Sequence, residues 1–482
     1  MKAHGAGSTA QMAGFMAATQ YADLPPSVVD DTKRIITDTL ACAVGASSFD
    51  AGQMVIAAAR ALGQAPSEST IVATGNKVSA AASAFANAYL ANLLDADETL
   101  LNSTHHACCT VFPALALCES LGLGGKELIT AVATGYDVGA RVGLSLTIAR
   151  INEQGDVQRV PSAGLGWATF GAAAAGGKAL GLSREQFAHA FGIAGWVSPI
   201  SSHRKWDETQ NLHMMKNSPH AFMGMHGVIA AQMAHGGFCA DSSIFDGEAG
   251  YWALAGSPDC HWDVLVGELG TKWWISEAAI KPYALCRLAH HSIDAFRKII
   301  KEQNFCADDI EAVQIKTFAR VASPFLSRTA APETPIAAQF NLPFALAACA
   351  YGFDLTLQWQ GPEVLSDHRL RSFTRKIKIE TDAGIQKLMA DDLRRTRRYP
   401  RVPAEVTVTA KGEAHTARTE YAWGDPASEE TRMTDGELKK KFSAFTETVL
   451  TPVRTDAALE ALFDLENIND VARELMPLLS RP

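Results

Sequence analysis

The sequence predicts a mainly α-helical protein, with a large all-helical domain and a smaller α/β lid domain. Two observations predict this fold class. Apolar residues recur at helical spacing through most of the first 270 residues, whereas stretches that alternate apolar and polar residues, as half-buried strands do, appear after Gly270. The chain of 482 residues is also longer than one hydrophobic core usually serves, so two domains are expected.

The helical part begins after Pro25-Pro26 with a helix whose apolar positions include Ile35, Leu40 and Val44. A run from Ala80 to Leu93, built mostly from Ala and Leu, is predicted to be a buried helix. Further helices are predicted at residues 126–142, 164–182 and 223–233. Because the last two are rich in Ala and Gly, they can approach other helices closely, and we expect the first of them to be central.

The α/β part contains strand-like stretches at residues 312–318 and 376–380 and a hairpin of residues 404–410 and 415–421 joined at Lys411-Gly412. Helices are predicted at residues 292–303 and 343–351. Beyond Thr434 the pattern is helical again, and we expect this segment to dock on the first helices. The predicted domains are therefore residues 1–275 (helical), 276–424 (α/β lid) and 425–482 (the C-terminal part of the helical domain).

Composition excludes several classes of partner. The hydrophobic fraction is 47%, the charged fraction 20%, and the net charge −9 with a pI near 5.9. Without a basic field the chain is not expected to bind nucleic acid, although local Lys and His side chains can still hold a small anion. No apolar run is long enough to predict a membrane span, and residues 1–20 do not have the pattern of a signal peptide.

Nine cysteines stand mostly in apolar runs, and no CxxC pair occurs. An odd number without metal-binding spacing is typical of buried thiols in a reducing compartment. The predicted location is therefore the cytoplasm.

The stretch from Leu94 to His106 is the most informative part of the sequence. It places three acids, Asp95, Asp97 and Glu98, directly after a buried helix, where unpaired carboxylates are costly. Asp95 and Thr99 share a face if the helix continues. The turn signal Asn102-Ser103 then puts His105 and His106 on a loop. The stretch is either a polar helix end with a solvated loop or a functional site, and it matches no standard zinc spacing, so no metal is expected.

Other polar positions interrupt apolar sequence. Lys216 follows two methionines, and from this local context alone a surface position is favoured. Lys281, Arg287 and His290 lie near the predicted domain boundary, where they either line a cleft between domains or form an ion-pair cluster. Asp137 and Arg141 are predicted to form an internal helix pair, and residues 394–398 a solvated basic face.

These residues together resemble the MmgE/PrpD family. The resemblance rests on the order of several short motifs from about residue 10 to residue 460. They are Asp95-x-Asp97-x-Thr99 with His105, Gly135-Tyr136-Asp137 with Arg141, Thr169-Phe170-Gly171 with Leu180-Gly181-Leu182, Lys216 eleven residues before Gly227, and Lys281-Pro282-Tyr283 with Cys286-Arg287 and His290. The resemblance implies a homodimer without metal or organic cofactor, and an active site at the domain interface.

It also implies dehydratase, decarboxylase or epimerase activity on a small polycarboxylate. Carried over by position, the family's Asp, Thr and His fall on Asp95, Thr99 and His105, and its two lysines fall on Lys216 and Lys281. We therefore expect a cofactor-independent lyase that moves a proton next to a carboxylate. His105 would move the proton, and the lysines would neutralise substrate carboxylates. An epimerase of an iminodisuccinate-like dicarboxylate is the first alternative, and a non-catalytic binding relative the second.

Two departures from the family pattern concern the substrate. Ser162 stands near the position where the family's lyases carry a histidine, and Phe344 replaces a tyrosine. We expect His290 or His213 to supply the missing proton transfer. Because a hydroxyl and an imidazole are lost, weak activity on 2-methylcitrate and cis-aconitate is also expected.

Overall fold

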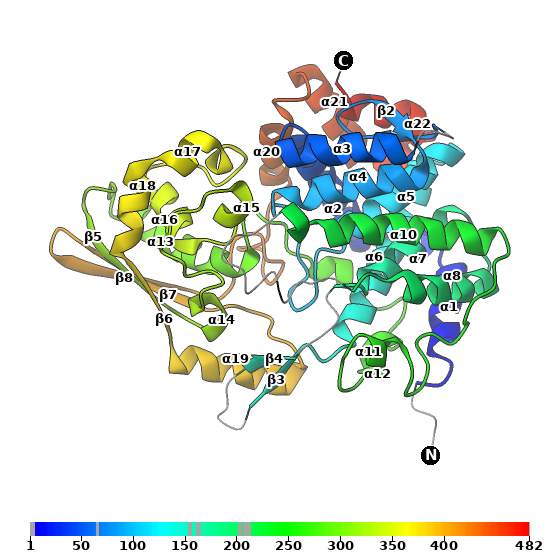
Figure 1. The fold of residues 1–482 in the computed structure, drawn as a ribbon, viewed down its shortest axis with the longest axis horizontal. Helices are drawn as coiled ribbons and strands as arrows, with labels where there is room; N and C mark the ends of the chain where they lie inside the picture. The colour runs from blue at the N-terminus through cyan, green and yellow to red at the C-terminus, as the bar shows by residue number, and fades with distance from the viewer. Residues whose placement is uncertain are drawn as a thin grey trace.

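The structure, a computed structural model, describes residues 5–63, 67–152, 157–160, 165–200, 205 and 214–481. The protein is mainly α-helical and its strands form small sheets only, which confirms the helical part of the predicted fold class. Figure 1 shows most helices gathered on the right and the largest sheet, with its own helices, on the left. The division at residues 275 and 424, and the role of the smaller part as a lid, stay proposals.

The helices on the right form around small residues. Helix α4 begins after Ser79, whose hydroxyl accepts a hydrogen bond from the Ala82 amide, and its Ala-rich sequence matches the predicted bounds. The larger helices of this part are α1 (Ser8–Ala18), α2 (Pro26–Ala46), α3 (Asp50–Leu62), α4 (Ala80–Leu93), α5 (Ala107–Leu121), α6 (Gly125–Leu144), α7 (Ala168–Ala179), α8 (Arg184–Val197) and α10 (Ser218–His235). Short elements between them are β1 (Ser69–Ile71), β2 (Asn76–Val78), β3 (Ala149–Ile151), β4 (Val157–Arg159), α11 (Tyr251–Leu254) and α12 (Trp262–Leu265).

Helix α7 is the central helix of this part, as predicted, since it packs against α5, α6, α8 and α10. Its neighbours approach it at glycines. A Cβ on Gly227 of α10 would lie 2.2 Å from the Cβ of Ala172, and one on Gly135 of α6 would lie 2.6 Å from the Cβ of Ala175. Larger side chains at these crossings would push the helices apart and disturb the packing beneath the site.

The largest sheet has the strand order β6-β5-β7-β8. Strands β5 (Ile310–Thr317) and β6 (Ile377–Thr381) are parallel, whereas β7 (Ala404–Ala410) and β8 (Glu413–Thr419) form an antiparallel hairpin. Lys411 and Gly412 both have positive φ, of 53° and 78°, as a two-residue hairpin turn requires. This tight turn starts β8 at Glu413, two residues before the predicted strand.

Helices cover one face of this sheet. Helix α13 packs on β7 and β8, and Figure 1 shows α13, α16 and α18 above the strands. The helices of this part are α13 (Arg287–Glu302), α14 (Ala319–Ala322), α15 (Pro335–Ala338), α16 (Leu342–Ala350), α17 (Pro362–Ser366), α18 (His368–Phe373) and α19 (Ala383–Thr396).

The arginines at the end of α19 are not simply a solvated face, which corrects that expectation. Arg397 has a positive φ of 60° and turns the chain towards the helical part. There Arg397 pairs with Asp263 at 2.7 Å, and Arg398 with Glu277 at 2.6 Å. These exposed cations therefore connect the two parts of the molecule.

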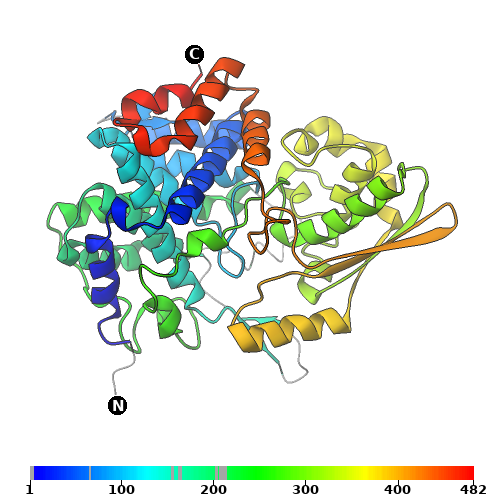
Figure 2. The same cartoon turned by 180° about the vertical axis from the view of Figure 1, so that it is seen from behind.

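The C-terminal helices return to the first helices, as Figure 2 shows from behind. They are α20 (Asp435–Thr446), α21 (Pro452–Phe463) and α22 (Val471–Glu474). Helix α20 starts at a capping box formed by Thr434 and Glu437, and it packs along α2. Apolar side chains that the sequence assigns to this contact, including Leu438 and Phe442, are fully buried.

All nine cysteines are free thiols. Five are buried, but Cys239 and Cys306 are exposed, so the prediction of buried thiols holds for part of the set. Among the described residues, no single helix is long and apolar enough to span a membrane. Only α2 and α3 taken together reach that length and hydropathy, and they are bent by 97° relative to each other.

Candidate active site

The predicted site begins where α4 ends. The helix does not continue through the acidic stretch, because Asp95 adopts a left-handed conformation with φ of 52°. Asp95 and Thr99 therefore do not share a helical face, which corrects that expectation. Both residues nevertheless line one cavity, since the chain turns back after Asn102, which also has a positive φ.

The carbonyl groups at this helix end are held by side chains from distant parts of the chain. The last carbonyls of a helix have no partner within it and need donors from elsewhere. Here each of four consecutive carbonyls receives at least one. The donors are Asn217 (3.2 Å) and Gln339 (3.0 Å) to Leu93, Gln360 (3.3 Å) to Leu94, Lys281 to Asp95, and Lys441 (2.7 Å) to Ala96.

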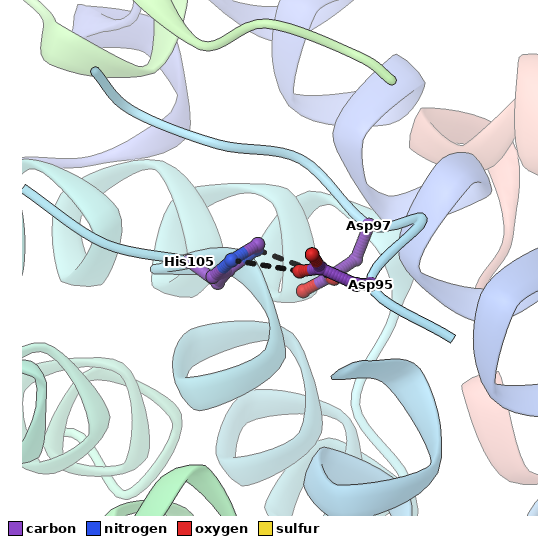
Figure 3. Close-up of side chains that lie close together, drawn as sticks. All are labelled: Asp95, Asp97 and His105. Atoms are coloured by element: carbon purple, nitrogen blue, oxygen red, sulfur yellow. Dashed lines mark ion pairs between the residues drawn. The ribbon is translucent and has the colours of Figure 1, made fainter. Parts of the chain in front are cut away.

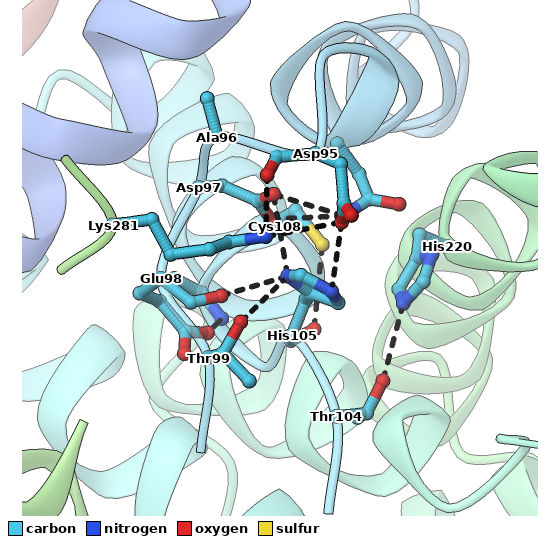
Figure 4. Close-up of polar contacts among 12 residues, drawn as sticks. Asp95, Ala96, Asp97, Glu98, Thr99, Thr104, His105, Cys108, His220 and Lys281 are labelled. Carbon is cyan, nitrogen blue, oxygen red and sulfur yellow. Dashed lines mark hydrogen bonds and ion pairs between the residues drawn. The ribbon is translucent and has the colours of Figure 1, made fainter. Parts of the chain in front are cut away.

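The Asp95 carboxylate is the centre of the site (Figure 4). Its Oδ1 lies 2.9 Å from Lys216 Nζ, 3.0 Å from Lys281 Nζ and 3.4 Å from His105 Nε2. Burial alone would raise the pKa of Asp95, but the two ammonium groups and the imidazole outweigh it and hold that pKa well below its usual range. Asp95 is therefore a permanent anion between three nitrogen groups.

His105 is fixed through one ring nitrogen. Its Nδ1 lies 2.7 Å from the carbonyl oxygen of Glu98, which can only accept, so Nδ1 carries a proton. The same nitrogen lies 3.2 Å from Asp97 Oδ1, and Figure 3 shows the carboxylates of Asp95 and Asp97 together on one side of the ring. Nε2 faces Asp95 at the cavity, and it is the nitrogen that can exchange a proton with a substrate.

The neighbouring histidine has a different role. His106 is fully buried, its Nε2 lies 2.8 Å from the Ser103 hydroxyl, and burial lowers its pKa to about 3. It therefore stays neutral at ordinary pH and acts as a packing residue at the start of α5. Of the two adjacent histidines, only His105 lines the cavity among the described residues.

Glu98 is a buried acid behind the site. Its carboxylate accepts hydrogen bonds from the Ala107 amide at 2.5 Å and from the Tyr136 hydroxyl at 3.1 Å. Burial nevertheless raises its pKa to about 8. Because the folded-state pKa lies above the unfolded value, Glu98 stabilises the fold fully below about pH 4.3, and this contribution is lost as the pH rises through about 8.

The substitution Glu98→Gln is therefore expected to remove a pH dependence. Gln keeps the shape and the acceptor of a protonated Glu, so the thermal midpoint of the variant should rise relative to the wild type as the pH increases from 5 to 8. Thermal unfolding at pH 5 to 9, with the exposed Glu302→Gln as control, measures this. Parallel curves for wild type and Glu98→Gln would contradict it.

The site opens into a cavity of about 470 Å³ between the two parts of the molecule. Asp95, Thr99, His105, Lys216 and His220 line it from the helical part. The other part contributes Arg287, Leu288, Phe318, Arg320, Phe325, Phe340 and Tyr399. Among the described lining residues Asp95 is the one acid, and Lys216, Arg287 and Arg320 are the basic side chains. Lys216 pairs with Asp95, and Arg287 pairs with Asp425, which does not line the cavity. The cavity therefore suits an anionic ligand.

The structure separates the predicted site residues into three groups. Asp95, Thr99, His105, Lys216 and Arg287 line the cavity. Lys281, His290 and Phe344 are fully buried and are not among its lining residues. His213 and Ser162 lie outside the described residues.

Lys216 is buried, which corrects the surface position that its local sequence favours. Its ammonium group is stabilised by Asp95 and by Asn92 Oδ1 at 3.3 Å, partners that lie more than 120 residues away in the chain. This distance explains why local context misleads. Asp137 and Arg141 do form the predicted internal pair, at 2.5 Å.

His290 and Phe344, which we expected to contact the substrate, do not line the cavity. His290 Nδ1 lies 3.0 Å from Arg287 Nη1, and its Nε2 lies 3.1 Å from the Leu285 carbonyl. Phe344 packs beside Trp359, with ring centroids 6.4 Å apart. Phe340, four residues earlier in the chain, does line the cavity, together with Phe318, Phe325 and Tyr399. The expected loss of a hydroxyl at Phe344 therefore does not reach the cavity, and the specificity argument built on it loses its basis.

Sequence reasoning missed two cavity residues. His220, on α10, has its Nε2 3.3 Å from the Thr104 hydroxyl, and its ring lies edge-on to His105 with centroids 5.7 Å apart. Arg320, on α14, lies over the Phe325 ring at 3.7 Å. Both stand in unremarkable local sequence, and only the position of His220 four residues after Lys216 on the next turn offers a signal.

Asp95, Asp97 and His105 offer ligand atoms within 4.8 Å of one another, close enough to consider a metal ion. The surroundings do not favour one. The Lys216 and Lys281 ammonium groups lie within 3.0 Å of the same Asp95 oxygen, so a metal cation there would meet two positive charges. The donor set fits a proton-transfer site better than a metal centre.

Comparison with known proteins identifies the family of this chain. The family model for the MmgE/PrpD N-terminal domain matches residues 10–262, and the model for the MmgE/PrpD C-terminal domain matches residues 283–465. The chain belongs to the MmgE/PrpD family, which confirms the resemblance seen in its motifs.

Three relatives have related names. The chain is 25% identical to a cis-aconitate decarboxylase of Aspergillus terreus over 316 aligned positions, 61% of this chain and 60% of that protein. A second Aspergillus terreus sequence of the same name is 24% identical over the same shares. A cis-aconitate decarboxylase-like protein of Aspergillus oryzae is 23% identical over 98% of this chain and 97% of its own length. The matches to the first two relatives thus span about 60% of their length.

Proposed function

We propose that this protein is a lyase, either a dehydratase or a decarboxylase, that acts on a small polycarboxylate by moving a proton at a carbon next to a carboxylate. One observation carries the proposal. The exchangeable Nε2 of His105 stands beside an anion, Asp95, at the wall of a cavity that three permanent cations line. The names of the relatives support the same reaction class.

The chemistry follows from the residues at the wall. His105 Nε2 removes the proton from the carbon, and the electron pair moves into the adjacent carboxylate as an enediolate, whose charge Lys216 stabilises. In a dehydration the pair then forms a C=C bond as the β-hydroxyl leaves with a proton from His220. A decarboxylation begins without removal of a proton: the C–C bond to a carboxylate breaks, CO₂ leaves, and the electron pair of that bond takes a proton from the protonated His105. No cofactor is needed in either sequence.

Lys281 has a different part from the one expected. It donates to the backbone carbonyl and to the carboxylate of Asp95, and it is fully buried behind the wall. We therefore assign it to holding Asp95 in place, while Lys216 and Arg320 contact the substrate carboxylates. Both lysines are ion-paired, which suits charge stabilisation rather than attack on a carbonyl.

An epimerase is the second candidate, and the histidine pair favours it. Epimerisation needs two acid/base groups, and His105 and His220 stand 5.7 Å apart at one cavity. Deuterium exchange separates the candidates. Purified protein is incubated in deuterated water with a panel of di- and tricarboxylates, including cis-aconitate, and both exchange and product are followed.

A lyase gives an unsaturated or decarboxylated acid, whereas an epimerase gives exchange with inversion and no change in formula. The absence of exchange and product across the whole panel would overturn the proposal and favour a non-catalytic binding relative. We propose a homodimer as the working assembly, and light scattering tests it.

Arg320 is expected to act in substrate binding. A hydrogen bond to a charged group contributes about 1.5–3 kcal/mol, so Arg320→Met should raise KM by about 10-fold or more and leave kcat within about three-fold. Steady-state kinetics with the best acid of the panel measures this. The exposed Arg375→Met, at the opposite end of β5 and β6, is the control. Equal losses in kcat would contradict a role in binding alone.

A further inference from the structure

A second buried ion pair lies behind the site and takes no part in the mechanism above. Lys441, on α20, pairs with Asp38, on α2, and their side chains are 5% and 0% exposed. Neither residue lines the cavity. Replacing a buried pair by apolar side chains of similar volume is often neutral or stabilising, so stability alone is a weak reason for such a pair.

Lys441 also makes a hydrogen bond to the backbone near the site, and this bond suggests a role for the pair. Lys441 Nζ donates to the carbonyl of Ala96 at 2.7 Å. Ala96 is fully buried and stands between Asp95 and Asp97, the two carboxylates that flank His105. A lysine at the end of the chain's helical part thus reaches the segment that carries the candidate acid/base.

The backbone at this point needs a donor. Asp95 has a left-handed φ of 52°, a conformation that residues other than glycine adopt only when their surroundings favour it. Its own carbonyl is held by Lys281, and the next carbonyl is held by Lys441. The two ammonium groups also lie at the C-terminal end of α4, where the helix dipole favours positive charge.

We propose that Lys441 is a positioning residue for the active site, and that Asp38 keeps it charged and directed at the Ala96 carbonyl. Lys441 holds the 95–97 segment so that the Asp95 carboxylate stays beside Nε2 of His105 and the Asp97 carboxylate beside Nδ1. The kinetic part of this inference rests on the proposed function. The structural part, the order of the 95–97 segment, does not.

The test uses a pair of double variants. Asp38→Asn/Lys441→Met removes both charges and the bond to Ala96 and leaves no unpaired buried ion. The matched control, Arg34→Met/Asp435→Asn, removes another ion pair between the same two helices, α2 and α20, away from Ala96. Both variants are compared with the wild type by calorimetry, by amide hydrogen exchange with mass spectrometry, and by kinetics with the panel acid that the wild type turns over fastest.

In Asp38→Asn/Lys441→Met, kcat should fall by about 10- to 100-fold while KM changes by less than about three-fold, because misplaced catalytic groups cost turnover more than binding. Peptides that cover residues 94–107 should exchange about tenfold faster, whereas those of α7 should not change. The control variant should keep the wild-type kcat and exchange pattern.

Wild-type exchange and kcat in the Asp38→Asn/Lys441→Met variant would overturn the proposal. So would equal losses in both double variants, or a failure of the first to fold, since either result would make Lys441 a residue of general stability. If the wild type turns over no acid of the panel, the proposed function fails, and the exchange measurement still decides the role of Lys441.

Discussion

Replacing His105 by Ala is expected to reduce turnover by about 10²- to 10⁴-fold, the usual range for a lost acid/base. The physical reason is that the Glu98 carbonyl fixes Nδ1 of His105, which leaves Nε2 at the cavity to exchange a proton with the substrate. The thermal midpoint should also fall, because the side chain is only 14% exposed and pairs with the buried Asp97 carboxylate; the loss of turnover is therefore measured at a temperature where the variant is folded. Deuterium exchange into substrate and steady-state kinetics measure the loss.

The exposed His235→Ala is the control for general effects of removing an imidazole. A second variant, His105→Gln, keeps a donor for the Glu98 carbonyl and should lose as much activity as His105→Ala. If either His105 variant stays within a few-fold of the wild type, the assignment of His105 as the acid/base is wrong, and His220 becomes the leading candidate.

The second large effect is expected at Lys281. Breaking a buried ion pair by removing one partner usually costs about 3–5 kcal/mol, because the other charge is left uncompensated. Lys281→Met removes a fully buried ammonium group 3.0 Å from Asp95, together with its bond to the Asp95 carbonyl. Because Asp95 keeps Lys216 at 2.9 Å, the cost should lie below this range. We expect a clear fall in the thermal midpoint and loss of turnover.

A triple variant separates the two effects. Lys216→Met/Lys281→Met/Asp95→Asn removes all three charges and leaves none of them buried without a partner, so it should recover part of the stability but none of the activity. Calorimetry and kinetics on the same preparations measure both quantities. If Lys281→Met unfolds at the wild-type temperature, the ammonium group is not what holds Asp95, and the pairing described here has little energetic weight.

The sequence predicts the elements of this fold well where local chemistry decides them. Helix α4 has its predicted bounds because Ser79 caps an Ala-rich run, and the hairpin turn falls on Lys411-Gly412 because two residues with positive φ are needed there. The motif order also places Asp95, His105 and Lys216 together, which distance in the chain alone would not suggest.

What sequence could not predict depends on partners far away in the chain. Asp95 leaves the helix because donors more than 100 residues away hold its backbone, and Lys216 is buried because Asp95 neutralises it. Arg320 carries no local signal, and His220 carries only its spacing from Lys216, since each reaches the cavity through the packing of its helix. For Phe344 and His290 the sequence misled in the opposite direction. Both lie in segments that match family motifs, but both are buried and neither lines the cavity.

The four held carbonyls at the end of α4 have a consequence for biogenesis. A ribosome releases residues 93–96 long before their donors at positions 217, 281, 339, 360 and 441. Until then those carbonyls remain hydrated, and the segment has no reason to adopt its final shape. We therefore expect the active site of a nascent chain to form late, after α20 has packed against α2. Recovery of activity during refolding would then report the completion of the whole chain rather than the formation of its helices.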